Sequence, residues 1–106
     1  MTKAVFTRLC FLLETTPEEI SSKSHLRAMT RKRQMLSAFL RENEKTSLVK
    51  IGKMLKRDHS TIINSIRCHK TEMFIDKQYS SEYMEFMIQA ERQAKMIENP
   101  FYCLHV

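Results

Sequence analysis

The chain has 106 residues, a length that suits one domain with a single modest hydrophobic core. It contains one glycine and two prolines, and 28% of its residues are charged. This composition argues against a sheet protein and predicts an all-α bundle of about six helices spanning residues 1–106. The three scattered cysteines, with no C-x-x-C pair, indicate reduced thiols. With neither a membrane-length apolar run nor a secretory signal at the start, we expect a cytoplasmic protein.

The formal net charge of +6 is concentrated in one third of the chain. Residues 21–57 contain eleven Lys or Arg and two Glu, for a net charge of +9. The remainder carries seven basic and ten acidic residues, for a net charge of −3. A basic block of this kind indicates a polyanionic partner. A solvated charged surface that keeps the protein soluble is the alternative, and charge alone does not separate the two.

Two short helices are predicted before the basic block. Apolar residues at helical spacing predict the first over residues 3–13. Thr16, Pro17 and Glu19 form a helix-start signal for the second, which ends near Ile20. Residues 21–27 then form a polar, basic loop. Its small residues would permit close approach to a partner, although an ordinary linker is the alternative.

A third helix is predicted from Thr30 to about Asn43, and its core residues are Met35, Leu36, Phe39 and Leu40. Arg31, Lys32 and Arg33 stand in its expected first turn, where three cations oppose the helix dipole and repel one another. Phosphate bound from outside would relieve that repulsion. We therefore expect phosphate contacts here, with a merely solvated helix end as the alternative.

The stretch over residues 47–70 predicts two helices joined by a tight, charged turn. Ser47 is a natural N-cap for the first helix, whose apolar stripe is Leu48, Ile51, Met54 and Leu55. Gly52, the only glycine, predicts a neighbouring helix packed too closely for a Cβ atom. Lys56 and Arg57 form the turn, and Asp58 is the expected N-cap of the second helix.

The second helix of this unit has one apolar and one polar face. The apolar face is Ile62, Ile63, Ile66 and Met73, and the polar face is Ser60, Asn64, Arg67 and Thr71. This pattern is typical of a helix-turn-helix, whose second helix can lie in a DNA major groove. Common capping chemistry is the alternative explanation for the Asp, Ser and Thr residues at its start.

A final helix is predicted from Ser80 to about Glu98, and it braces the core. Its expected buried seam is Tyr83, Met87, Ala90, Ala94 and Ile97, with Met84 and Ile88 beside it. Asn99 and Pro100 end this helix. The tail over residues 99–106 is apolar, and we expect it to dock on the core, with a partner-binding peptide as the alternative.

Three segments resemble the DNA-binding domain of the bacterial replication initiator DnaA, in order and in register. R-D-H-S-T-I-I-N-S-I from Arg57 is similar to the family signature, in which R-D-H-[ST]-[TS] precedes apolar residues. T-R-K-R-Q-M from Thr30 resembles the family's R-x-R-Q-M segment, and S-L-V-K-I-G from Ser47 resembles its S-L-x-x-I-G segment. The resemblance covers roughly residues 16–97, so the helix within residues 1–15 would be an addition.

The resemblance implies sequence-specific binding to short duplex DNA sites, in replication-related or transcriptional regulation. The base contacts that it implies are Asp58, His59, Ser60 and Thr61. The DNA backbone contacts are Arg31, Arg33, Gln34, Ser47, Lys50 and Arg57. The loop residues that would line the adjacent minor groove are Lys23, His25 and Arg27.

Two departures from the family pattern bear on function. No G-x-x-x-x-G-K-[ST] loop is present and one glycine cannot build it, so we expect no ATPase activity from this chain. His25 stands where the family typically has a minor-groove arginine. A neutral imidazole fills a narrow, negative groove less well than a guanidinium does.

A second interpretation is a small helical adaptor that has lost or weakened specific DNA binding and holds another protein through the two-helix unit or the apolar tail. The C-terminal tail could also join two copies of this chain in a homodimer. Salt titration separates the two interpretations, because DNA binding weakens steeply as salt rises. Cys68-His69 and Cys103-x-His105 are conceivable metal ligands, but their spacing matches no common zinc pattern. We therefore expect no metal, no cofactor and no catalytic group.

Overall fold

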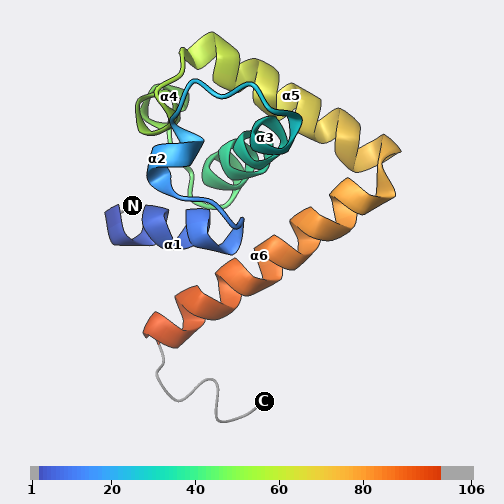
Figure 1. Ribbon diagram of the computed structural model, residues 1–106. Coiled ribbons are helices and arrows are strands. Elements are labelled where there is room, and N and C mark those ends of the chain that lie inside the picture. The colour runs from blue at the N-terminus through green and yellow to red at the C-terminus, as the bar shows by residue number, and fades with distance from the viewer. Residues whose placement is uncertain (1–2, 99–106) are drawn as a thin grey trace.

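The computed structural model describes residues 3–98, with side chains described through residue 92. Over this range the secondary structure is entirely helical, which confirms the predicted fold class. Helix α3 lies at the centre of the view in Figure 1, and α6 runs diagonally below the other helices. The helices are α1 (Lys3–Leu12), α2 (Pro17–Ile20), α3 (Arg27–Glu42), α4 (Leu48–Leu55), α5 (His59–Ile75) and α6 (Lys77–Glu98).

The core forms around α3, which packs against α2, α4 and α5. The predicted apolar face of α3 is buried, with Leu36 and Leu40 fully enclosed. Ile51 and Leu55 of α4 and Ile62 of α5 join the same cluster. The periodicity of the apolar residues was thus a reliable guide to the interior, because each helix buries one stripe.

Helices α4 and α5 form the helix-turn-helix, and Gly52 makes their tight turn feasible. Lys56 ends α4 in a left-handed conformation, with φ 54° and ψ 47°, and the Arg57 N–H donates to the Gly52 carbonyl at 2.8 Å. A Cβ atom on Gly52 would lie 2.6 Å from the Arg57 carbonyl oxygen. The predicted close approach is present, but the neighbour is the backbone of the turn and not a packed helix.

Two helices begin three residues earlier than predicted. Helix α3 begins at Arg27 and not at Thr30, so Arg31 and Arg33 do not lie in its first turn, and the dipole argument for phosphate binding there was wrong. Helix α6 begins at Lys77 and not at Ser80. The reason is that the Asp76 carboxylate accepts a hydrogen bond from the Tyr79 N–H at 3.1 Å and so caps the new helix.

The side chains that α6 buries differ in part from those predicted. The buried residues are Tyr79, Tyr83, Phe86 and Ala90. Met87 is half-buried, whereas Met84 and Ile88 are 55% and 50% exposed. The expectations for the side chains of Ala94 and Ile97 and for the tail over residues 99–106 lie outside the part that the structure describes. Among the described helices, none has the length and apolarity to cross a membrane.

Candidate nucleic-acid interface

The first turn of α5 presents a run of exposed polar side chains. Asp58, at the N-cap position, has extended backbone, and its carboxylate accepts a hydrogen bond from the Ser60 hydroxyl at 3.1 Å. His59 Nδ1 lies 3.8 Å from the same carboxylate, and its side chain is 60% exposed. Thr61 is also exposed. The four residues predicted to contact bases therefore share one accessible turn, where imidazole and hydroxyl groups face solvent.

Arg33 is buried and holds the loop between α2 and α3, contrary to the solvent-facing position that a phosphate contact requires. Its side chain is 7% exposed. Its Nε donates to the Ile20 carbonyl at 2.7 Å, Nη1 to the Ser24 carbonyl at 2.6 Å, and Nη2 to the Ser22 carbonyl at 2.9 Å. All three donor nitrogens of the guanidinium thus bind main-chain oxygens of the loop.

Arg57 ties the same loop to the turn of the helix-turn-helix. Its Nη2 also donates to the Ser22 carbonyl, and its Nη1 donates to the Lys56 carbonyl at 3.1 Å. The Ser22 carbonyl therefore accepts from α3 and from the turn at once. Burial, and then the neighbouring Arg57 cation, lower the pKa of Arg33. The two arginines fix the position of the loop relative to the start of α5.

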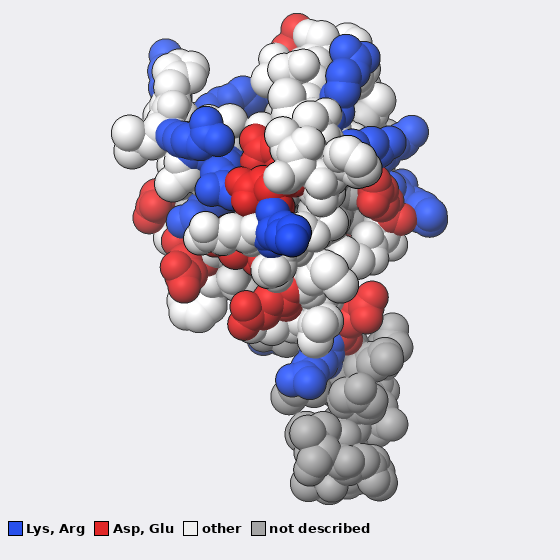
Figure 2. Space-filling model, turned by 90° about the vertical axis from the view of Figure 1, so that its right-hand side faces the viewer, with Lys and Arg blue, Asp and Glu red and all other residues white. Residues whose placement is uncertain are grey.

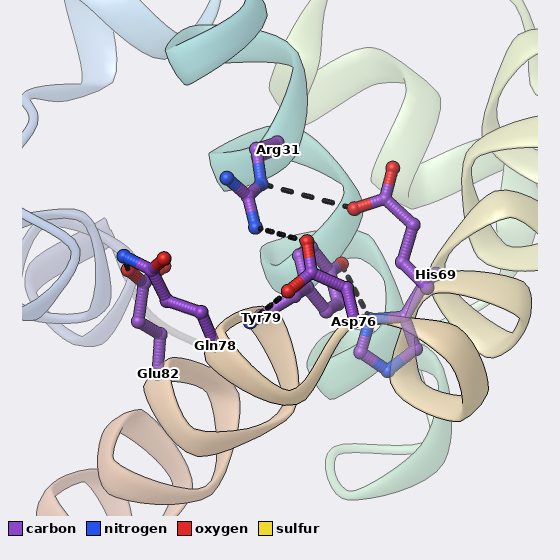
Figure 3. A network of polar contacts seen from close by, with 7 residues as sticks. Arg31, His69, Asp76, Gln78, Tyr79 and Glu82 are labelled. Carbon is purple, nitrogen blue, oxygen red and sulfur yellow. Dashed lines mark hydrogen bonds and ion pairs between the residues drawn. The ribbon is translucent and has the colours of Figure 1, made fainter.

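Arg31 points toward Asp76, at the junction of α5 and α6 (Figure 3). Its Nη2 lies 3.1 Å from Asp76 Oδ2, and its Nε lies 3.7 Å from Glu72 Oε2. The guanidinium also lies over the ring of Tyr79, 5.2 Å from the centroid. Arg31 therefore joins three helices through contacts within the chain.

The remaining predicted backbone contacts divide by exposure. Gln34 is buried at 6% exposure. Ser47 and Lys50 are exposed, and the Ser47 hydroxyl caps α4 as predicted by accepting from the Lys50 N–H at 3.2 Å. Lys23, His25 and Arg27 are all exposed. Of the backbone set, Ser47 and Lys50 are thus the residues whose side chains are offered to solvent.

The charges are not uniform over the surface. At the α5–α6 junction, on the right of Figure 1, acidic and basic side chains lie side by side (Figure 2). Arg31, Glu72 and Asp76 form ion pairs here. This face is therefore a poor match for a polyanion, although it flanks the helix that carries the exposed polar turn.

His69 is a core residue that the sequence reasoning missed. It is 3% exposed, its Nδ1 lies 2.7 Å from the Tyr79 hydroxyl, and its ring packs edge-on against Tyr83 at 4.3 Å. Burial, and then the nearby Lys70 cation, lower the pKa of His69 to about 4. The signal was present, because His69 follows Ile62 and Ile66 at helical spacing on the buried face. No group of three metal-binding side chains occurs among the described residues.

The arrangement defines a helix-turn-helix domain of the DNA-binding class. The family model described as bacterial dnaA protein helix-turn-helix matches residues 3–68, so the chain belongs to this family. The match includes α1, which the sequence resemblance had left outside, and it ends before the C-terminal part of α5 and all of α6.

A curated relative supports the same family. The chromosomal replication initiator protein DnaA 1 of Chlamydia muridarum is 42% identical over 52 residues. The aligned segment covers 49% of this chain and 11% of that protein. The similarity therefore concerns only a small part of the length of that protein.

Proposed function

We propose that this protein binds duplex DNA at specific sequences, with the first turn of α5 in the major groove. Asp58, His59, Ser60 and Thr61 make the base contacts. The observation that carries this proposal is the exposure of all four residues on one turn. Imidazole and hydroxyl groups can bond base edges, and a threonine methyl can contact a thymine methyl.

The phosphate contacts divide between direct and indirect roles. Ser47 and Lys50 contact the DNA backbone directly, because their side chains are exposed. Arg33 and Arg57 act as positioning residues, since their guanidinium groups already bind carbonyl oxygens of the loop. Arg31, which is ion-paired, likewise supports the fold.

The loop between α2 and α3 supplies the minor-groove contacts through Lys23, His25 and Arg27. Its support is geometric, because Arg33 and Arg57 hold this loop at Ser22, against the turn that precedes α5. One duplex would then meet the loop and the helix together. Minor-groove arms next to a major-groove helix occur in other DNA-binding domains.

The chain acts by binding alone and does not hydrolyse ATP. It contains no G-x-x-x-x-G-K-[ST] loop to cradle a nucleotide phosphate. Occupying initiator-type sites in this way would serve replication control or transcriptional regulation.

Selection from randomised duplexes with the purified protein tests the proposal. We expect enrichment of one short motif. The affinity for this motif should fall steeply as the salt concentration rises, because the Lys and Arg side chains that bind phosphates release counterions from the DNA. Enrichment of no motif, together with a salt-independent affinity, would exclude specific DNA binding.

A protein-interaction adaptor is the second candidate function, and exposed apolar side chains favour it. Phe74 and Ile75, at the end of α5, are 91% and 69% exposed, and they lie beyond the family match. Phe74 is roughly 22 Å along the helix axis from His59, at 1.5 Å per residue. A protein bound there would leave the start of α5 accessible. Pull-down with Phe74→Ser as the control separates this activity from DNA binding.

A further inference from the structure

The polar face of α5 continues beyond its first turn. Asn64 lies four residues after Ser60 and three after Thr61, spacings that make side chains neighbours on a helix surface. It is exposed, and no contact with another described residue engages its amide. The amide group is thus available, and it stands on the face that the proposed function directs at DNA.

We propose that Asn64 reads an adenine in the major groove and so determines specificity at a base step that the first turn does not reach. An asparagine amide can donate to adenine N7 and accept from N6, a pairing that the other bases do not offer. Asn64 lies roughly 4.5 Å beyond Thr61 along the helix axis. Stacked base pairs repeat every ~3.4 Å along the duplex, so a distance of roughly 4.5 Å corresponds to one or two base pairs beyond the one that Thr61 contacts.

Arg67 marks the limit of this reading face. It lies one turn beyond Asn64, is exposed, and its guanidinium is likewise unengaged among the described residues. Its backbone carbonyl accepts from the Thr71 hydroxyl at 3.2 Å. A long cation placed here suits a phosphate at the groove edge, which gives affinity without sequence preference. Asn64 and Arg67 therefore contribute differently, and mutants can separate the two contributions.

The inference rests on the proposed function, and the test distinguishes failure of one from failure of the other. The motif selected by the wild-type protein is changed one base pair at a time, and each duplex competes for wild type, Asn64→Ala and Thr61→Ala. We expect Asn64→Ala to lose roughly 5- to 150-fold discrimination at one A·T step. Thr61→Ala should leave discrimination at that step intact and lose it at another.

Three comparisons complete the design. Asn64→Gln keeps the amide and should retain an adenine preference at the step. Arg67→Ala should weaken binding to all duplexes alike and flatten the salt dependence by about one charge. Thr71→Ala, about two turns beyond position 64, should bind like wild type. Alanine at exposed position 64 is expected to preserve the helix, and circular dichroism checks that it does.

The outcomes are decisive in both directions. A wild-type protein that selects no motif would overturn the proposed function and this inference together. A clear wild-type motif with Asn64→Ala discriminating as well as wild type, or weakened equally on all duplexes, would overturn the inference and leave the proposed function standing.

Discussion

The two ends of α5 carry similar polar residues but place them in opposite environments. His59, at the start, is 60% exposed, whereas His69, three turns later, is 3% exposed and bonded to Tyr79. Asp58 faces solvent, whereas Asp76 binds Arg31 and caps α6. The C-terminal end of α5 is thus packed against the rest of the protein, whereas its N-terminal end is exposed to solvent. Residue type alone does not reveal which of these two environments a side chain occupies.

The largest effect is expected when the loop loses its anchor. Arg33→Ala removes three hydrogen bonds from a buried guanidinium to loop carbonyls and should lower the free energy of unfolding by roughly 3–5 kcal/mol. Urea denaturation measures the change. Arg27→Ala is the matched control, since that side chain is exposed and unpaired among the described residues. Weakened DNA binding with unchanged stability would restore Arg33 as a phosphate contact.

Acid should loosen the anchored end of α5. The pKa of His69 is lowered to about 4 in the folded protein, against an ordinary 6.5, so the unfolded chain binds the proton more readily. The free energy of unfolding should therefore fall by roughly 1.4 kcal/mol per pH unit between about pH 6 and pH 4.

Urea denaturation at a series of pH values measures this dependence. His69→Phe should remove the pH dependence of stability that is due to His69. The substitution also removes the hydrogen-bond partner of the Tyr79 hydroxyl. An identical slope in the variant would show that another group is responsible.

Substitutions in the exposed first turn of α5 should change DNA recognition and leave the stability of the fold nearly unchanged. Thr61→Ala is expected to lose roughly 1–3 kcal/mol of discrimination at its own base step. Its free energy of unfolding should change by less than about 0.5 kcal/mol, because the side chain is exposed. Competition binding with single-base variants measures the first quantity. Lys50→Ala, the comparison variant, should weaken binding to all duplex sequences alike. Identical behaviour of the two variants would refute direct readout by Thr61.

A substitution in the turn between α4 and α5 should destabilise the protein less than the loss of Arg33. Gly52→Ala places a Cβ atom 2.6 Å from the Arg57 carbonyl oxygen, and the strain should exceed the gain in helix propensity by about 1–2 kcal/mol. Thermal unfolding and DNA affinity should both decline, because the turn orients α5. Lys53→Ala, at the exposed neighbouring position, should match wild type, and an unperturbed Gly52→Ala would show that the turn adjusts freely.

Local patterns were enough to predict the helices, the caps of α2 and α4 and most of the core, whereas Asp58 stands at the N-cap position of α5 without a side-chain capping bond. Thr16 accepts from the Glu19 N–H as expected, and Ser47 caps α4. The same patterns failed for Arg33, because a cation in a basic run looks accessible until the position of the loop carbonyls is known. They also placed Ile63 on the buried face, where it is 38% exposed. The accessible turn at Asp58–Thr61 was inferred from resemblance, since spacing alone allowed capping as its explanation.

The double use of the Ser22 carbonyl has a consequence for mutagenesis. The acceptor is a main-chain oxygen, which every amino acid supplies, so replacing the side chain at position 22 leaves this junction intact. Alanine at position 22 would remove only the hydrogen bonds of the Ser22 hydroxyl, to the Glu19 carbonyl at 2.7 Å and from the Ser24 N–H at 3.4 Å, and would not report on the junction between the two distant segments. Mutagenesis can test the junction only by replacing its donors, Arg33 and Arg57. A backbone ester, which makes the carbonyl oxygen a weaker acceptor, would test the junction directly.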